Sequence, residues 1–452
     1  MAGSSSVGKM TNYRWVICAL LFFATTVNYI DRQILALLKP ILDVQIGWTN
    51  AQYGLINSLF QAAYGLGLLW FGWYVDRRGV RRGYAISMIG WSLAAMAHAL
   101  IVLIPAGLSF FVGQKEFKYT LIAVSAFGLC RILLGAAEAG NFPSAIKAVA
   151  QWFPKRERAF ATSLFNSGCN VGAIAAPALV PLLAYSFGWQ STFIIAGAVG
   201  FVWLFFWLPM YKSPEGHPKV SKEELAHILS DREDVSTEKT PWLKLLGFKQ
   251  TWSFVIGKFL TDPVWWFFLI WLPDFFKKTR GLDIKNSWLH LVTIYAIVTV
   301  LSIFGGWITG HLVKSGWSVT KARKVGMCIF ALMVLPILLV RSSGDWVAVM
   351  LIGLAGAAHQ AWSANLFTTV SDMFPKKAIA SVVGLGGMAG SLGGMMFPIW
   401  SGMLLDKYDK VGRINDGYAI LFGFCAMAYI VAFAVHHMLA PKFVPFDIDK
   451  KS

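Results

Sequence analysis

About twelve long apolar segments dominate this 452-residue sequence. A helix needs about 20 mostly apolar residues to cross the hydrocarbon core of a bilayer. The segments therefore predict an all-α polytopic membrane protein with twelve transmembrane helices. They lie near residues 15–38, 51–74, 83–105, 119–140, 158–184, 189–210, 252–276, 287–313, 324–341, 346–370, 379–405 and 417–439.

The charge distribution supports a membrane protein and argues against a nucleic-acid-binding one. Only 14% of the residues are charged, whereas soluble proteins carry about 25%. The net charge of +17 comes largely from basic residues in short connections, such as 76–82, 154–158, 321–324 and 375–377. Basic connections favour the cytoplasmic side, so both termini are expected there, although the connection 277–285 is also basic.

One long polar stretch divides the apolar segments into two sets of six. We expect a cytoplasmic tail at 1–14, a first bundle at 15–210, a cytoplasmic linker at 211–250, a second bundle at 251–440 and a tail at 441–452. Residues 152–177 align without a gap on 373–398, with Phe-Pro-Lys and a later Gly and Pro matching. This repeat indicates two halves of the same orientation.

Four charged residues interrupt the apolar segments of the first half: Asp31, Arg32, Arg131 and Glu138. A charge at the centre of a spanning helix costs about 2.5–3.5 kcal/mol on insertion scales. Arg131 and Glu138 are seven residues apart, so they share a helix face at a separation of about 10 Å and cannot touch. Either the four groups form a structural network between two helices, or they act on a substrate.

Several motifs resemble the major facilitator superfamily. "GWYVDRRGVRR" at 72–82 is similar to its signature between helices 2 and 3. "NYIDRQ", "RILLGAAEAGNFP" and "WFPKRERA" resemble the anion:cation symporter family, and "GKFLTDPVWWFFLIWLPDFF" and "GAAHQAWSANLFTTVSDMFP" look like bacterial hexuronate transporters. The second half has Gly310 where the first has Asp76, which predicts an asymmetric conformational latch.

The resemblance and the chemistry of the four charges suggest their roles. The family resemblance implies proton coupling by Asp31 and Glu138. A uronate is a carboxylate, which a guanidinium binds through two parallel hydrogen bonds. We expect Arg32 to hold that carboxylate; Arg131 is a second candidate, with pairing to the acids as its favoured task.

Neutral polar and aromatic residues are candidates for binding sugar hydroxyls and ring faces. Each has an alternative role in packing, in the interface belt or in bridging helices. His359 lies 221 positions after Glu138, at the equivalent depth of the second half. The candidates are Tyr29, Tyr64, Asn166, Asn170, Trp265, Trp266, His359, Gln360, Trp362 and Asn365.

Other charged residues are expected to control conformation. Asp76, Arg77, Arg81 and Arg82 lie at the cytoplasmic edge, where they would bind helix ends. Lys258 and Asp262 are four residues apart and can pair on one helix. A gating or structural role is favoured for this pair over binding of a substrate carboxylate.

The sequence thus predicts a transporter, not an enzyme, that imports a hexuronate such as glucuronate or galacturonate with protons by alternating access. No cofactor or metal is expected. The expected setting is a bacterial inner membrane, with a monomer in the lipid bilayer as the functional unit. The alternatives are transport of an aldonate such as galactonate, exchange of a phosphate ester, or a polytopic membrane enzyme or sensor.

Overall fold

A computed structural model describes residues 10–102, 115–230 and 242–444. Within them the chain forms helices and no strand. The first half contains α1 (Tyr13–Ile46), α2 (Asn50–Arg78), α3 (Val80–Ala99), α5 (Lys115–Glu138), α6 (Asn141–Trp152), α7 (Lys155–Phe187) and α8 (Trp189–Met210). The second contains α11 (Lys249–Arg280), α12 (Ile284–Lys314), α13 (Val319–Val334), α14 (Asp345–Met373), α15 (Lys376–Asp409) and α16 (Ile414–Leu439).

The twelve predicted segments each correspond to a helix or to two consecutive helices, which confirms the predicted fold class. The fourth segment corresponds to α5, and α6 follows it beyond the predicted end. The ninth continues from α13 into the 3-10 helix η3 (Leu335–Ser342). By length and composition, ten helical segments of the described residues qualify as membrane spans. The helices α2 and α3 supply the other two predicted segments.

Several helices are longer than the apolar segments that predict them, because capping residues, and not the loss of apolar residues, end them. The helix α1 continues eight residues beyond its predicted end and stops at Gly47, whose φ of 69° places it in the left-handed region. Glycine tolerates this conformation at little cost. Thr49 and Gln52 then form a capping box that starts α2, so the turn between the two helices is short.

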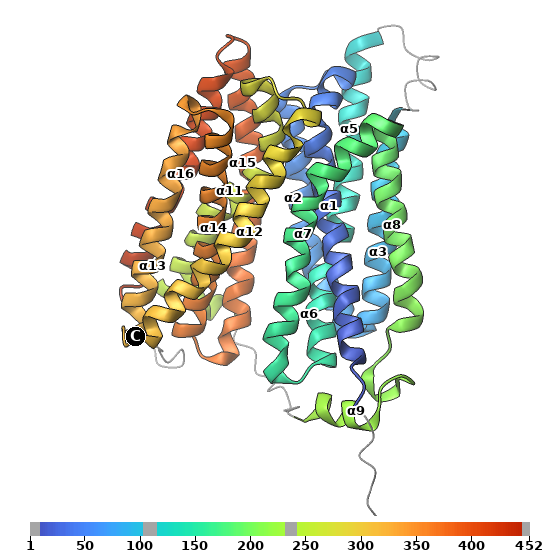
Figure 1. Ribbon diagram of the computed structural model, residues 1–452, viewed down its shortest axis with the longest axis vertical. Coiled ribbons are helices and arrows are strands. Elements are labelled where there is room, and N and C mark those ends of the chain that lie inside the picture. The colour runs from blue at the N-terminus through green and yellow to red at the C-terminus, as the bar shows by residue number, and fades with distance from the viewer. Residues whose placement is uncertain (1–9, 103–114, 231–241, 445–452) are drawn as a thin grey trace, which may run out of the picture.

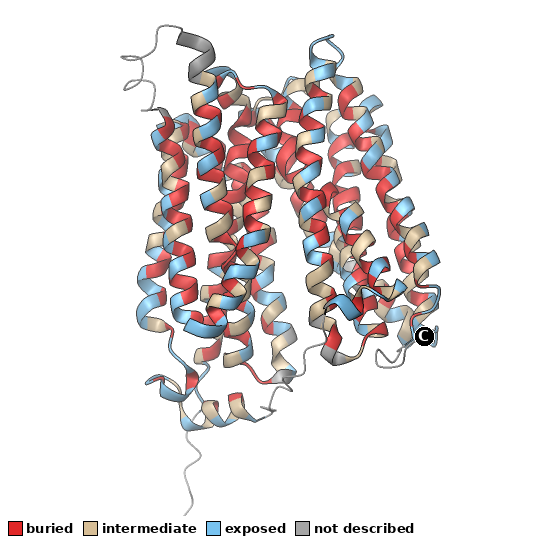
Figure 2. Ribbon diagram, turned by 180° about the vertical axis from the view of Figure 1, so that it is seen from behind, coloured by how far each residue is buried: buried red, intermediate tan, exposed pale blue. Residues whose placement is uncertain are grey.

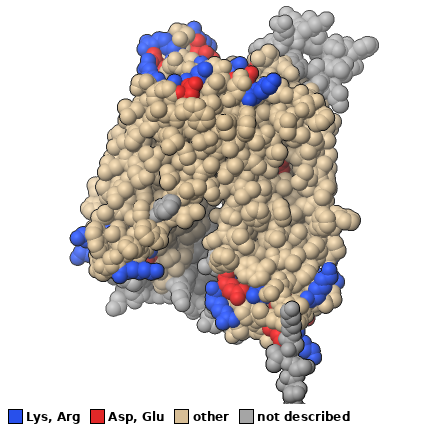
Figure 3. All heavy atoms as spheres, viewed as in Figure 1, with Lys and Arg blue, Asp and Glu red and all other residues tan. Residues whose placement is uncertain are grey.

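The two groups of helices stand side by side, with α2 against α15 and α7 against α12 (Figure 1). Buried residues fill the interior of each group, and exposed residues face outward (Figure 2). Lys, Arg, Asp and Glu gather at the two ends of the molecule, and the belt between the ends is nearly free of them (Figure 3). This is the arrangement expected for helices that cross a bilayer.

The described parts of both chain ends lie at one end of the bundle, here called the termini end. Thr11 bonds to Glu224 of the linker helix α9 (Lys222–Leu229), which lies below the first half (Figure 1). The short helices η2 (Pro214–Gly216) and α10 (Trp242–Leu245) complete the described linker. The predicted tails fall largely outside the described residues, as does the middle of the predicted linker.

The opposite end, where α1 ends and α2 begins, is here called the far end. The two halves meet closely there: a Cβ added to Gly54 of α2 would lie 2.2 Å from the carbonyl oxygen of Pro398 in α15. A Cβ on Gly402 of α15 would lie equally close to the carbonyl of Asn50. Toward the termini end the surface is hollowed between the halves (Figure 3).

Candidate functional site

The four charged residues of the first half come together in the structure. Asp31 and Arg32 lie near the middle of α1, and Arg131 and Glu138 lie on α5. All four are buried, with exposed fractions between 0% and 7%. We refer to Asp31, Arg32, Arg131 and Glu138 as the charged cluster.

One ion pair holds this cluster together. The Arg32 Nε donates to a Glu138 carboxylate oxygen at 2.7 Å, which ties α1 to α5. The sequence analysis favoured Arg131 as the partner of the acids. Instead, the Arg131 Nη2 donates to the amide oxygen of Asn57 on α2 at 3.1 Å. Asp31 accepts a hydrogen bond from the indole of Trp91 on α3.

Five polar atoms of the charged cluster are buried without a hydrogen-bond partner among the described residues. They are Asp31 Oδ1, Arg32 Nη2, Arg131 Nε, Arg131 Nη1 and Glu138 Oε1. Buried polar groups are normally paired, and a charged group without a partner is costly. A ligand that both accepts and donates hydrogen bonds would satisfy these atoms, and a hydroxylated carboxylate has this chemistry.

Aromatic rings surround the guanidinium of Arg32. Its Cζ lies 4.4 Å from the ring centroid of Tyr64, 5.3 Å from that of Tyr29 and 5.6 Å from that of Phe60. Trp266 of α11 contributes a fourth ring at 5.7 Å. Because α11 belongs to the second half, Arg32 lies where the halves face each other.

The other candidates of the second half make contacts within that half. The rings of Trp265 and His359 stack at a centroid distance of 5.5 Å, and the His359 Nδ1 is 2.6 Å from the Tyr429 hydroxyl. Trp362 packs edge-on against the same tyrosine. Asn365 accepts a hydrogen bond from Arg323. These are contacts within the packed second half, and the binding roles of these four residues remain predictions.

Three further candidates have fewer contacts. Asn166 and Asn170 lie on α7, where Asn166 is exposed and Asn170 is half-buried. The Cys169 thiol donates weakly to the Asn166 amide oxygen at 3.5 Å. Gln360 of α14 is also half-buried. Their binding roles remain predictions.

The contacts of the residues expected to control conformation are known in part, and their role remains a prediction. Asp76 pairs with Lys147 of α6 at 2.9 Å, and Arg81 donates to the carbonyl of Leu208 near the end of α8. Arg77 lies over the ring of Trp73. Arg82 is exposed.

The predicted pair on α11 is present: Lys258 and Asp262 are 2.8 Å apart. The ammonium of Lys258 also lies 4.6 Å from the ring centroid of Phe367 on α14. The pair therefore connects α11 to a neighbouring helix of its own half.

Sequence reasoning missed the neutral partners of the charged cluster. Trp91 and Asn57 are each fully or nearly fully buried in helices, and their polar atoms face Asp31 and Arg131 respectively. The only signal in the sequence is a polar atom in an apolar segment, which many residues of such a chain share.

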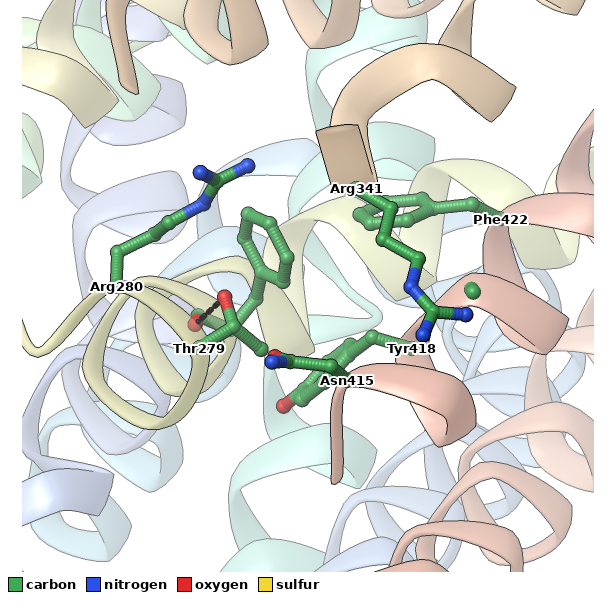
Figure 4. Close-up of a pocket in the computed structure, with 8 residues that line it drawn as sticks. Thr279, Arg280, Arg341, Asn415, Tyr418 and Phe422 are labelled. Atoms are coloured by element: carbon green, nitrogen blue, oxygen red, sulfur yellow. Dashed lines mark hydrogen bonds between the residues drawn. The ribbon is translucent and has the colours of Figure 1, made fainter. Parts of the chain in front are cut away.

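A pocket lies away from this cluster, between α11, η3 and α16, where Arg280 and Arg341 face it (Figure 4). Arg280 donates to the carbonyls of Ser343 and Val340, and Arg341 pairs with Asp416 at 2.5 Å. Both guanidinium groups are thus already engaged. Among the described residues no group of three or more His, Cys, Asp or Glu side chains could hold a metal ion.

Comparisons with known proteins agree with the fold. The Major Facilitator Superfamily profile matches residues 21–398. The hexuronate transporter of Escherichia coli K12 is 31% identical, with 94% of this chain and 95% of that protein covered. A probable galactarate/D-glucarate transporter of Bacillus subtilis strain 168 is 29% identical, covering 96% of this chain and 93% of that protein.

A solved structure shows the same architecture. It is a bacterial homologue of the human lysosomal transporter Spinster in an inward-facing and occupied conformation, and it aligns with a TM-score of 0.73. The alignment covers 96% of this chain and 98% of that one, at 16% sequence identity. With the family profile and the relative at 31% identity, these observations establish that the chain is a multi-pass membrane protein of the major facilitator superfamily.

Proposed function

We propose that this protein imports a hexuronate, such as glucuronate or galacturonate, together with protons across a bacterial inner membrane. The observation that carries the proposal is the charged cluster, in which five buried polar atoms have no hydrogen-bond partner among the described residues. The names of its relatives, a hexuronate transporter and a probable galactarate/D-glucarate transporter, support an anionic sugar as the substrate.

The residues divide into two roles in this proposal. Arg32 and Arg131 hold the substrate carboxylate, because guanidinium stays charged when it is removed from water. Tyr29, Tyr64 and Trp266 surround Arg32 and cover the sugar. Asp31 and Glu138 carry the proton.

The Arg32–Glu138 ion pair suggests how the two roles are linked. A carboxylate that approaches Arg32 competes with Glu138 for the same guanidinium. Protonation of Glu138 weakens its hold on Arg32 and frees that group for the substrate. Binding of the proton and of the anion therefore favour each other, as symport requires.

The closed far end and the hollow toward the termini end correspond to one state of an alternating-access cycle. With the termini on the cytoplasmic side, as the basic connections predict, this state faces inward. We propose that the reverse state opens the far end and presents the charged cluster to the outside.

Uptake by purified protein in liposomes tests the proposal. We expect glucuronate or galacturonate to accumulate when the outside is made acidic, and neutral glucose not to compete. Galactonate and glucarate as competitors separate hexuronate transport from transport of an aldonate or an aldarate. No uptake of any sugar acid under an imposed pH gradient would contradict the proposal and favour a sensor or an enzyme.

Variants of the acids test the coupling. Asp31→Asn and Glu138→Gln should abolish acid-driven accumulation. At least one variant should retain exchange of labelled for unlabelled substrate, because exchange needs no net proton movement. Asp409→Asn is the matched control, since that carboxylate is 45% exposed at the far end. Unchanged accumulation in both single variants and in the double variant would remove the acids from the mechanism.

A further inference from the structure

We propose that Lys39 and Asp274 form a latch, an ion pair that sets the fraction of molecules in which the far end is closed. Lys39 lies on α1 of the first half, and Asp274 lies on α11 of the second half. This inference rests on the proposed alternating-access function, because it assigns to one ion pair the control of the equilibrium between its two states.

Both members of this ion pair are buried. Lys39 is 0% exposed and Asp274 is 1% exposed, and the Lys39 Nζ donates to Asp274 Oδ1 at 2.7 Å. Aromatic rings shield the ammonium: its Nζ is 5.1 Å from the ring centroid of Tyr53 and 5.7 Å from that of Trp271. These two rings also come from opposite halves, so the shield exists only while the far end is closed.

Each member of the pair has a second partner in its own half. The Lys39 Nζ also donates to Asp43, one turn later on α1, at 2.6 Å. The second oxygen of Asp274 accepts from the Tyr418 hydroxyl of α16 at 2.5 Å. Separation of the halves therefore leaves neither charge without a partner. A contact that breaks and re-forms requires such second partners.

Neighbouring contacts close the same surface. The carboxylate of Asp406 on α15 accepts from the backbone N–H groups of Asn50 and Ala51, which begin α2, at 2.8 and 2.9 Å. The Tyr53 hydroxyl donates to the carbonyl of Ile270 at 3.0 Å. The latch is the charged centre of this closed surface.

The energetics of buried ion pairs predict an unusual pattern for variants. Attraction between buried charges roughly offsets their desolvation, so replacing both partners with apolar residues is often neutral or stabilising. Removal of one partner is unfavourable in the closed state, because the other charge stays buried there and keeps only the partner in its own half. In the open state water reaches both groups, so the same changes have little effect there. Single variants should therefore open the far end, and the double variant should close it.

Distances between spin labels in lipid nanodiscs measure the equilibrium directly. Val44→Cys in the first half and Val411→Cys in the second, 86% and 64% exposed, place labels at the far end of a background without native cysteines. Lys39→Met and Asp274→Leu should each raise the ratio of open to closed protein by about a hundredfold. The double variant should return this ratio to the wild-type value or below it.

Asp345→Asn is the matched control. Its carboxylate is 3.7 Å from the guanidinium of Arg280 within the second half and is 40% exposed, so the label distance should not change. The proposed latch is contradicted if both single variants keep the wild-type label distances. It is also contradicted if the double variant is as open as the single variants. If a single variant does not purify as folded protein, Lys39→Gln or Asp274→Asn takes its place under the same criteria. Label distances do not depend on transport, so absent sugar-acid uptake overturns the proposed function alone.

Discussion

Aromatic rings crowd around Arg32 more closely than around the other cations that the structure describes. Four aromatic rings lie within 6 Å of its guanidinium carbon, and its Nη2 has no partner among the described residues. Rings that face a planar cation fix its orientation as well as its position. The free N–H groups are thus held in one direction, as two parallel hydrogen bonds to a carboxylate require.

This geometry predicts the effect of Arg32→Lys. Lysine keeps the charge but loses the planar fork and its stacking, so affinity for the sugar acid should fall by about 10- to 100-fold, the equivalent of one or two good hydrogen bonds to a charged group. Equilibrium binding of glucuronate to the purified variant measures the change. Arg413→Lys, at a side chain that is 68% exposed, is the control. Equal affinities for wild type and Arg32→Lys would show that the guanidinium geometry has no role in binding.

At the scale of helices, two close contacts between α2 and α15 depend on glycine. Gly402→Ala places a Cβ 2.2 Å from a backbone oxygen of α2, and backbone cannot move aside as a flexible side chain does. We expect this variant to favour opening of the far end, seen as a longer distance between labels at positions 44 and 411. Gly387→Ala is the control on the same helix, because its added Cβ meets nothing within 4 Å. Equal distances in both variants would contradict this role for Gly402.

The sequence was informative about elements and about contacts within them. Apolar length located the twelve segments, and the spacing of four predicted the Lys258–Asp262 pair that is present. Contacts between helices were harder to predict. Arg131 and Glu138 were correctly expected not to touch, but the choice of Arg32 as the partner of Glu138 depends on how α1 packs against α5.

The Lys39–Asp274 latch is a second contact between helices that was hard to predict from the sequence. Lys39 and Asp274 are 235 positions apart, and only the packing of the halves brings them together. A signal was nevertheless present, because Asp274 lies inside a predicted membrane segment and Lys39 directly follows one. The reasoning that selected Arg131 and Glu138, applied to every charge in or beside an apolar segment, would have selected both residues.

For the whole molecule, the two acids of the charged cluster leave two transport schemes open. Import of a monovalent anion with one proton moves no net charge, so the pH difference alone drives it. A tenfold proton gradient then supports about tenfold accumulation. With two protons the complex carries one positive charge, the same gradient supports about a hundredfold accumulation, and 100 mV adds about 2.3 kcal/mol.

Burial of the charged cluster favours the scheme with one proton. With all four groups ionised the cluster is neutral, so one bound proton and one sugar-acid carboxylate together leave it neutral. A second proton would leave one positive charge buried without compensation, which is unfavourable. We therefore expect accumulation in liposomes to stay unchanged when a potassium gradient with valinomycin makes the inside negative at constant pH difference. Accumulation that rises with the negative potential in the wild-type protein would contradict this expectation and indicate two protons per sugar acid.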